Sequence, residues 1–186
     1  MCIRDRLGPI DILVNNAGTS QRGPFLGVSD ELWQNDLDLK LFAAIRLTRL
    51  TIPSMKEKKW GRIINVLNIV AKAPPAEGAP TAVSRAAGMA LTKALAGEFA
   101  KDNILVNALL VGLIDSNQHL IRHQSSNSTG SYESFLEDMA TSQNIPLGRV
   151  GKAEEFADVA CFMASDRASY LSGTALNVDG GKCPVV

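Results

Sequence analysis

A hydroxyl and a guanidinium lie four residues apart in the alanine-rich segment 79–100, at Thr81 and Arg85. Residues at this spacing share one face of a helix. The threonine hydroxyl can donate and accept hydrogen bonds, and the guanidinium can hold ribose, phosphate or carboxylate oxygens. Neither group exchanges a proton near neutral pH. The pair therefore predicts contacts to an oxygen-rich ligand, and any proton transfer needs a further residue.

Two imidazoles show the same four-residue spacing, at His119 and His123. Two histidines on one helix face can bind a metal ion only when a third ligand joins them, and no third ligand stands at a matching spacing. The three cysteines, Cys2, Cys161 and Cys183, show no metal-binding pattern either. The sequence predicts no metal site. It favours reduced, structural thiols in a cytoplasmic protein.

The composition bounds the class of protein. The chain has 186 residues, of which 46 % are hydrophobic, and 19 basic side chains balance 19 acidic ones. This length and hydrophobic content suit one globular domain with a real core. The balanced charge gives no general attraction to nucleic acid or to an anionic membrane. No apolar run approaches the ~18 residues of a membrane span, and the first residues have no signal-peptide core.

Short apolar runs alternate with long segments of helical period. Strands are expected within 9–18, 61–68, 103–112 and 174–181, and helices over 29–52, 80–101 and 152–165. Ser29 suits the start of the first helix, and Pro53 is expected to disturb its end. Strands that are apolar on both faces and joined by helices indicate an α/β fold with a parallel sheet covered on both sides. Right-handed crossovers then give a doubly wound, Rossmann-type sheet.

The helix over 80–101 carries two contrasting stripes. Its large residues are expected to face the sheet, and its small residues to let another helix approach closely. The large stripe holds Val83, Leu91, Leu95 and Phe99, and the small stripe holds Ala86, Ala90, Ala94 and Gly97.

Residues 116–145 break this alternation, because they form a long polar stretch rich in Ser, Asn, Gln and Gly. A loop of this length in a compact domain is usually functional. In an α/β domain it would lie at the carboxyl ends of the strands, where ligands bind. The sequence predicts a substrate lid here, with one short helix near Tyr132–Thr141.

Four motifs in order carry a family resemblance. They are "NNAG" at 15–18, "GRIINV" at 61–66, "VNALLVGLIDS" at 106–116 and the long tail 145–181. Together they resemble the short-chain dehydrogenase/reductase family over about residues 8–181. The resemblance implies an oxidoreductase that uses NAD or NADP on a carbonyl or alcohol substrate. It also implies a homodimer or homotetramer formed through helices 30–52 and 80–101.

The resemblance also assigns the cofactor contacts. It places Asn15, Ala17 and Gly18 beside the adenosine, and Arg85 beside the nicotinamide ribose. The turn after the third strand would lie beside the nicotinamide, with close approach at Gly112 and contacts to the carboxamide from Ile114 and Ser116. Val111 replaces the family's usual proline in this turn. A structural role for Asn15, through backbone groups of the neighbouring strand, remains an equal alternative.

The family's catalytic machinery is replaced throughout. The motif spacing places Thr81 at the family's tyrosine, Arg85 at its lysine, Asn68 at its serine and Lys40 at its asparagine. One interpretation is an oxidoreductase in which Lys40 is the acid, with a pKa lowered by burial and by Arg85, and Asn68 donates to the carbonyl. A second is a non-catalytic module that binds a nucleotide or an anionic metabolite through Arg85 and Lys40. A third is that both side chains make only solvated or structural pairs.

The family's glycine-rich dinucleotide turn has no counterpart in the sequence. In the family, the strands and helices that carry this turn precede the "NNAG" motif. The chain is therefore expected to be a truncated Rossmann-type domain over 1–186, with a non-native leader at 1–7, and to be inactive alone.

Overall fold

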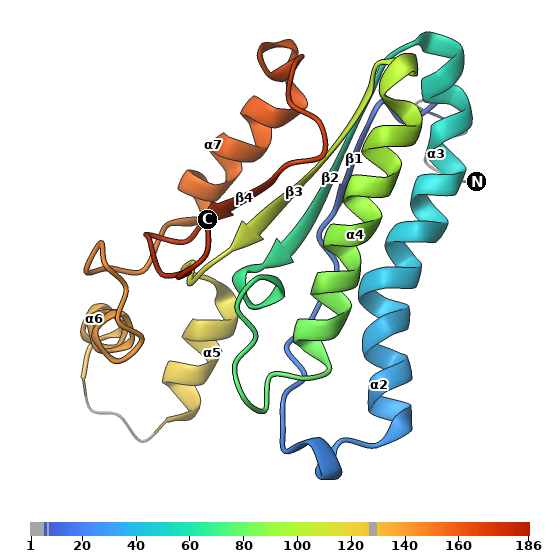
Figure 1. Ribbon diagram of the computed structural model, residues 1–186. Coiled ribbons are helices and arrows are strands. Elements are labelled where there is room, and N and C mark those ends of the chain that lie inside the picture. Colours follow the sequence, from blue (N-terminus) through green and yellow to red (C-terminus); the bar gives the residue numbers. More distant parts are fainter. Residues whose placement is uncertain (1–5, 7, 127–129) are drawn as a thin grey trace.

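The computed structural model describes residues 6, 8–126 and 130–186. Its centre is a parallel sheet in the order β1-β2-β3-β4, which confirms the predicted α/β class (Figure 1). The strands are β1 (Ile12–Asn15), β2 (Gly61–Asn68), β3 (Ile104–Val111) and β4 (Ala175–Val178). β1 forms one edge of this sheet, and its Ile12 and Val14 side chains are exposed. Apart from Arg6, the predicted leader lies outside the described residues.

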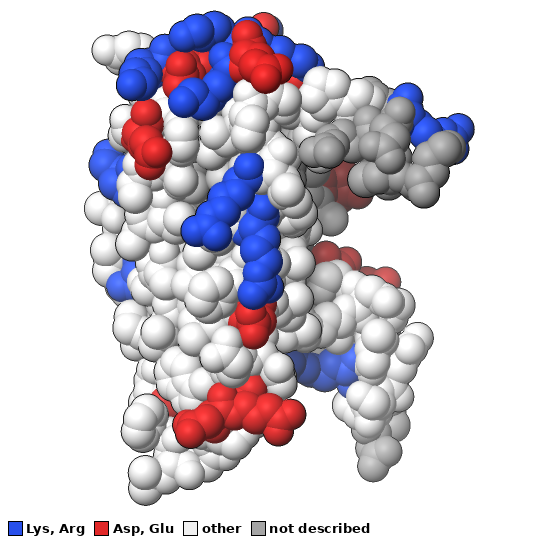
Figure 2. All heavy atoms as spheres, turned by 90° about the vertical axis from the view of Figure 1, so that its right-hand side faces the viewer, with Lys and Arg blue, Asp and Glu red and all other residues white. Residues whose placement is uncertain are grey.

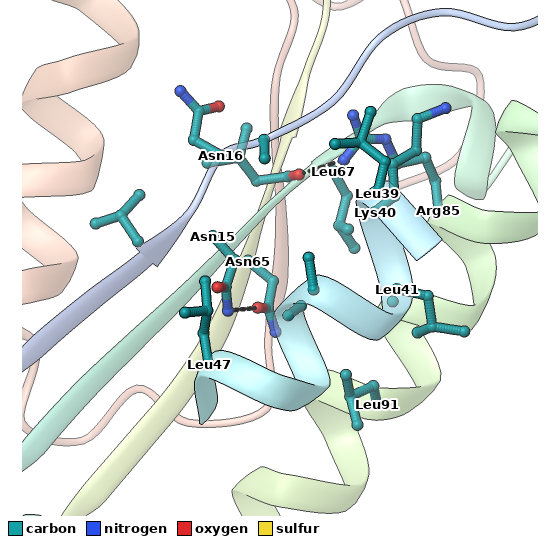
Figure 3. Close-up of a pocket in the computed structure, with 16 residues that line it drawn as sticks. Asn15, Asn16, Leu39, Lys40, Leu41, Leu47, Asn65, Leu67, Arg85 and Leu91 are labelled. Atoms are coloured by element: carbon teal, nitrogen blue, oxygen red, sulfur yellow. Dashed lines mark hydrogen bonds between the residues drawn. The ribbon is translucent and has the colours of Figure 1, made fainter. Parts of the chain in front are cut away.

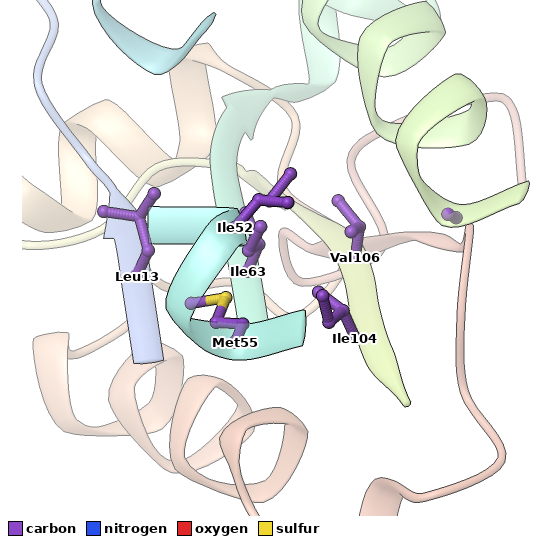
Figure 4. Packing of buried hydrophobic residues seen from close by; sticks show 7 residues of the cluster. Leu13, Ile52, Met55, Ile63, Ile104 and Val106 are labelled. Atoms are coloured by element: carbon purple, nitrogen blue, oxygen red, sulfur yellow. The ribbon is translucent and has the colours of Figure 1, made fainter. Parts of the chain in front are cut away.

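Helices cover both faces of the sheet. α3 (Ala43–Lys58) and α4 (Thr81–Phe99) pack on one face, and α7 (Ala153–Ala164) packs on the other. Neighbouring residues of β2 show the division, because successive strand side chains point to opposite faces. Ile63 joins a cluster with Met55 of α3 (Figure 4), whereas Ile64 joins a cluster with Met163 of α7. Both faces of β2 and β3 are therefore buried, as the continuous apolar runs predicted.

The helix expected over 29–52 is longer than predicted. It begins as α2 (Asp30–Leu37), capped by Ser29, passes through a π-helical turn (Asp38–Phe42) and continues as α3 to Lys58. The expectation that Pro53 disturbs its end is wrong, because Pro53 lies inside α3. Proline removes one backbone donor. Burial of Ile52 and Met55 on both sides of it keeps the helix on the sheet.

The predicted faces of α4 are also wrong in part. Leu95 and Phe99 of the large stripe pack on the core cluster that holds Ile63, as predicted. The fully buried residues of α4 are nevertheless small, and they are Thr81, Ala82, Ser84, Gly88, Thr92 and Ala96. A Cβ on Gly88 would lie 2.7 Å from Leu67 Cδ2, so a small residue is needed for α4 to approach β2 this closely. Val83 is instead exposed, and the rest of the large stripe is half-buried. The small stripe lies on the exposed side of α4, as expected.

The lid segment contains two helices in place of the one expected. α6 (Tyr132–Ser142) agrees with the prediction near Tyr132–Thr141, but α5 (Asn117–Ser125) was not anticipated. α5 was missed because its sequence is polar, with only Leu120 and Ile121 as large apolar residues. Residues 127–129, between the two helices, lie outside the described residues.

Within the described ranges, none of the helices is long and apolar enough to cross a membrane. The same ranges contain no cluster of three or more His, Cys, Asp or Glu side chains that could hold a metal ion.

Candidate active site

Four of the predicted site residues, namely Asn15, Ala17, Lys40 and Arg85, meet near the carboxyl ends of the strands, where ligands bind in open α/β sheets. A cavity of about 90 Å³ lies there, between the end of β1, the π-helical turn and α4. Lys40 and Arg85 line one part of it, and Asn15 and Asn65 line another (Figure 3). The other predicted residues do not line the same cavity, and they are Gly18, Asn68, Thr81, Gly112, Ile114 and Ser116.

Lys40 lies in a buried ion pair that the family motifs do not predict. Its ammonium contacts the carboxylate of Asp36, one turn earlier in the helix, and the two side chains are 1 % and 0 % exposed. The second carboxylate oxygen of Asp36 accepts a hydrogen bond from Ser84 Oγ at 2.6 Å. The four-residue spacing of Asp36 and Lys40 is the signal that could have revealed the pair.

The surroundings of Lys40 act on its pKa in opposite directions. Burial lowers the pKa of Lys40 most strongly, and the charges of Arg85 and Arg22 lower it further. The hydrogen bond and charge of Asp36 oppose this shift, but the net effect keeps the pKa of Lys40 below its ordinary value. The direction agrees with the expectation, although the opposing carboxylate was missed.

Thr81 is the next member of this chain of contacts. Its hydroxyl oxygen accepts from Lys40 Nζ and from the backbone N–H of Gln21, each at 2.9 Å. A hydroxyl has two acceptor lone pairs and one proton. Both lone pairs are occupied here, and no acceptor for the proton is found among the described residues. The Thr81 hydroxyl is therefore limited to acting as a donor toward anything else, although the residue is only 4 % exposed.

Asn68 lies at the end of β2, and only the oxygen of its side-chain amide makes a hydrogen bond within the described chain. Its Oδ1 accepts from the backbone N–H of Val70 at 3.0 Å and caps the short 3-10 turn Ile69–Ala71. Across the described chain, Nδ2 has no recorded partner. The amide can therefore donate to a ligand oxygen.

Arg85 is held against the turn after β1. Its Nη1 donates to the carbonyl of Val66 at 2.7 Å, and its Nε is buried without a partner in the described part of the chain. A Cβ on Gly18 would lie 2.3 Å from Nη2, so the glycine leaves the space that this guanidinium occupies. Burial lowers the pKa of Arg85, and the charge of Asp36 opposes the shift. An arginine remains charged in proteins, so a cation faces this part of the site.

Asn15 connects β1 to α4 through side chains. Its Nδ2 donates to Asn65 Oδ1 at 2.8 Å, and Asn65 in turn donates to Thr92 Oγ1 at 2.9 Å. This geometry supports the structural alternative for Asn15. Its own Oδ1 nevertheless lacks a partner in the described structure and could still accept from a ligand. Beyond it, Ala17 and Gly18 are exposed.

The turn after β3 fits the nicotinamide end of a dinucleotide in part. Ser116 is exposed at the start of α5, and its hydroxyl makes no hydrogen bond recorded for the described residues. Ile114 forms an isolated bridge with Gly151, which fixes its backbone. Gly112, in contrast, is required by internal packing, since a Cβ there would lie 2.5 Å from Cα of Asp179. The close approach that this glycine allows is therefore to the turn after β4.

Asp115, in the same turn, accepts a hydrogen bond from the Tyr132 phenol of α6. Partial burial and this bond to the carboxylate raise the pKa of Tyr132 to about 12. The folded state raises the pKa of Tyr132, so the bond to Asp115 stabilises the folded protein fully below the phenol's ordinary pKa. This stabilisation is lost as the pH rises through about 12.

We expect the phenol titration to report this contact directly. The chain has 2 tyrosines, so Tyr170→Phe leaves only Tyr132 to ionise. In that variant, tyrosinate absorbance after a rapid pH jump should rise with a midpoint of about 12. Asp115→Asn should lower the midpoint. A midpoint near ~10 with Asp115 present, the value of a free phenol, would show that the contact is not made in solution.

Comparison with known proteins finds relatives that are named as oxidoreductases. A family model described as enoyl-(acyl carrier protein) reductase matches residues 2–182. The chain is 39 % identical over 176 residues to oxidoreductase UcpA of Salmonella typhimurium, and the match covers 94 % of this chain and 65 % of that protein. The chain thus spans about two thirds of the length of this relative.

Two solved structures extend the likeness to the fold. One is the NADPH-bound structure of a short chain oxidoreductase from Pseudomonas aeruginosa PAO1 with an atypical catalytic center, at 32 % identity and a TM-score of 0.87 over 96 % of this chain and 67 % of that one. The other is L-sorbose reductase from Gluconobacter frateurii complexed with NADPH and L-sorbose, at 35 % identity and a TM-score of 0.91 over 99 % of this chain and 70 % of that one.

Proposed function

Since the chain belongs to the short-chain dehydrogenase/reductase family, we propose that its protein is an NAD(P)-dependent oxidoreductase that interconverts a carbonyl and an alcohol. The activity is proposed for the complete gene product, whatever residues it has beyond these 186. The 186-residue chain alone is proposed to be inactive, because its sequence holds no glycine-rich turn that leads a strand into a helix and could bind the pyrophosphate.

The observation that carries the proposal is the buried chain of contacts from Asp36 through Lys40 to Thr81. When bound, the nicotinamide supplies or accepts the hydride. Asn68 Nδ2 donates to the substrate carbonyl oxygen. As that oxygen gains negative charge, the Thr81 hydroxyl proton passes to it, and the Lys40 ammonium returns a proton to Thr81 Oγ1 across the 2.9 Å contact. Lys40 is left neutral beside Asp36 and recovers its proton from solvent.

The same geometry is compatible with the cofactor contacts that the family resemblance implies. Arg85 would hold the nicotinamide ribose, and the exposed residues Ala17 and Gly18 would lie beside the adenosine, with Asn15 Oδ1 as a further acceptor. The backbone at Ile114 and the free hydroxyl of Ser116 suit the carboxamide, while Gly112 shapes the turn. The NADPH in the Pseudomonas aeruginosa and Gluconobacter frateurii structures favours NADP over NAD as the first cofactor to test.

A second function is favoured by the burial of the same residues. Lys40 and Thr81 satisfy each other inside the protein and are almost inaccessible. A non-catalytic module that binds a nucleotide or an anionic metabolite would then rely on Arg85, and not on Lys40, for its positive charge. The atypical catalytic center named for the Pseudomonas aeruginosa protein is compatible with either function.

The two functions separate in one assay. The complete gene product is supplied with NADPH and a panel of ketones and aldehydes, and nicotinamide absorbance is followed over time. The proposed oxidoreductase consumes NADPH with at least one substrate class. Tight NADPH binding without turnover on any member of the panel would favour the module.

We also propose that the protein forms a homodimer or homotetramer through two helical segments. One is the helix formed by α2, the π-helical turn and α3, and the other is α4. The exposed side of these helices shows uncharged areas between a group of charged side chains at its middle and another at its top (Figure 2). It carries the exposed apolar side chains Leu39, Phe42, Leu47, Leu50 and Val83, beside the small stripe of α4. Apolar patches of this kind mark association surfaces. A cytoplasmic location, in keeping with the free Cys161 and Cys183, belongs to the same proposal.

Ala90→Arg tests this interface, because Ala90 lies in the centre of the exposed small stripe. A long charged side chain should keep the second helix away, and light scattering of the complete gene product should shift toward the monomer mass. Thr141→Arg, at an exposed position of α6, is the matched control and should leave the mass unchanged. An unaltered oligomer in Ala90→Arg would contradict the interface.

A further inference from the structure

A side-chain hydrogen bond between Tyr132 and Asp115, called the tie below, connects α6 to the turn that follows β3. The Tyr132 phenol donates to Asp115 Oδ1, 17 residues earlier in the chain. Asp115 is itself fixed at its backbone, since its N–H donates to the Gly151 carbonyl at 2.8 Å and its neighbour Ile114 forms a bridge with Gly151. The Tyr132 phenol therefore donates to a carboxylate whose own backbone is fixed by contacts to Gly151.

The ring of Tyr132 adds contacts to α5. It lies 5.6 Å from the ring of His123 and 6.2 Å from that of Phe135, measured between ring centroids. His123 belongs to α5 and Phe135 to α6. Tyr132 thus joins three parts of the lid region, namely the turn, α5 and α6.

Asp115 lies where its hydrogen bond to Tyr132 can influence the proposed cofactor contacts. It lies between Ile114 and Ser116, the two residues proposed to contact the carboxamide. Ser116 has an extended backbone, with φ −155° and ψ 159°, and successive side chains of an extended chain point to opposite sides. The Asp115 side chain, bonded to Tyr132, therefore points toward the lid, and the Ser116 side chain points to the opposite side, where it can face a ligand.

We propose that Tyr132 is a positioning residue for the nicotinamide side of the cofactor site, acting through Asp115 on Ser116 and on the first turn of α5. The inference rests on the proposed function for the identity of the ligand. The tie itself rests only on contacts within the chain. Tyr132 touches no reacting atom, so it should influence how firmly the nicotinamide end is held and leave the adenosine end unaffected.

The test compares two ligands on the complete gene product. Tyr132→Phe removes the hydroxyl and keeps the ring contacts. It should weaken NADPH binding by about tenfold, in keeping with the loss of a hydrogen bond to a charged acceptor. It should leave the affinity for 2′,5′-ADP, which has no nicotinamide, unchanged. Tyr170→Phe is the matched control, because Tyr170 is fully exposed, and it should alter neither affinity.

Equal weakening of both ligands by Tyr132→Phe, or no change in either, would overturn the positioning role. Hydrogen exchange of the ligand-free protein gives a second readout that needs no cofactor. Tyr132→Phe should speed exchange of the amides in the first turn of α5 and leave those of β2 and β3 as they are. Failure of the wild type to bind NADPH would count against the proposed function. In that case unchanged exchange in α5 would overturn the tie, and faster exchange would support it.

Discussion

Replacing Lys40 with methionine should lower carbonyl turnover by about 10²–10⁴-fold, the range for loss of a general acid. Methionine keeps the unbranched apolar stem of lysine, without the terminal nitrogen, and carries no proton to return to Thr81. The affinity for the cofactor should change little, because Lys40 contacts Asp36 and Thr81 and is almost fully buried. Steady-state kinetics of the complete gene product, with NADPH and its best carbonyl substrate, measure the effect.

Two variants distinguish loss of the acid from other damage. Lys40→Met alone leaves a buried carboxylate at Asp36, so Asp36→Asn combined with Lys40→Met removes both charges and should show the same loss of turnover. Arg85→Met should instead weaken cofactor binding, because its contacts position and do not transfer protons. Turnover that survives in the double variant would refute the assignment of Lys40 as the acid.

Replacing Asp36 with alanine should lower the free energy of unfolding by about 3–5 kcal/mol, the usual cost of removing one partner of a buried ion pair. The Lys40 ammonium would remain inside the protein with a side chain 1 % exposed and no carboxylate beside it. The pKa of Lys40, already lowered by burial, should then fall further. Urea denaturation of the complete gene product measures the loss.

The pH dependence of this loss identifies its cause. A lysine whose folded pKa is depressed binds fewer protons when folded than when unfolded, so stability rises with pH between the two pKa values. The deficit of Asp36→Ala should therefore shrink toward alkaline pH. Asp36→Leu combined with Lys40→Met should recover most of the stability, and Ser84→Ala should cost only about 1 kcal/mol. A deficit that is independent of pH would indicate that the carboxylate acts by packing alone.

The sheet was predictable because its two central strands, β2 and β3, are buried on both faces. β2 begins and ends where the apolar run begins at Gly61 and stops at Asn68. Pro53 was misjudged because a local rule for proline met a helix held on the sheet by Ile52 and Met55. The faces of α4 were misjudged for a related reason. Thr92 is polar but is buried, because Asn65 donates to it and it donates to the Gly88 carbonyl.

The candidate site was also predictable only in part. The positions of Lys40, Asn68, Thr81 and Arg85 followed from motif spacing, and their contacts did not. The ion pair of Asp36 with Lys40 could have been predicted, since Asp36 precedes Lys40 by one helical turn. Asp36 occupies none of the four catalytic positions that the family resemblance assigns. The contact between Gln21 and Thr81 spans 60 residues, and no local pattern announces it.

The pH dependence of the turnover number tests the central claim most directly, because it reports the protonation state of the acid in the complex. We expect turnover of the complete gene product to fall as the pH rises through the pKa of Lys40, which lies below its ordinary value. In Asp36→Asn the fall should move to lower pH, since the carboxylate that favours protonated Lys40 is gone. A fall at the same pH with Asp36→Asn, or one that persists when Lys40 is methionine, would contradict proton delivery by Lys40 through Thr81.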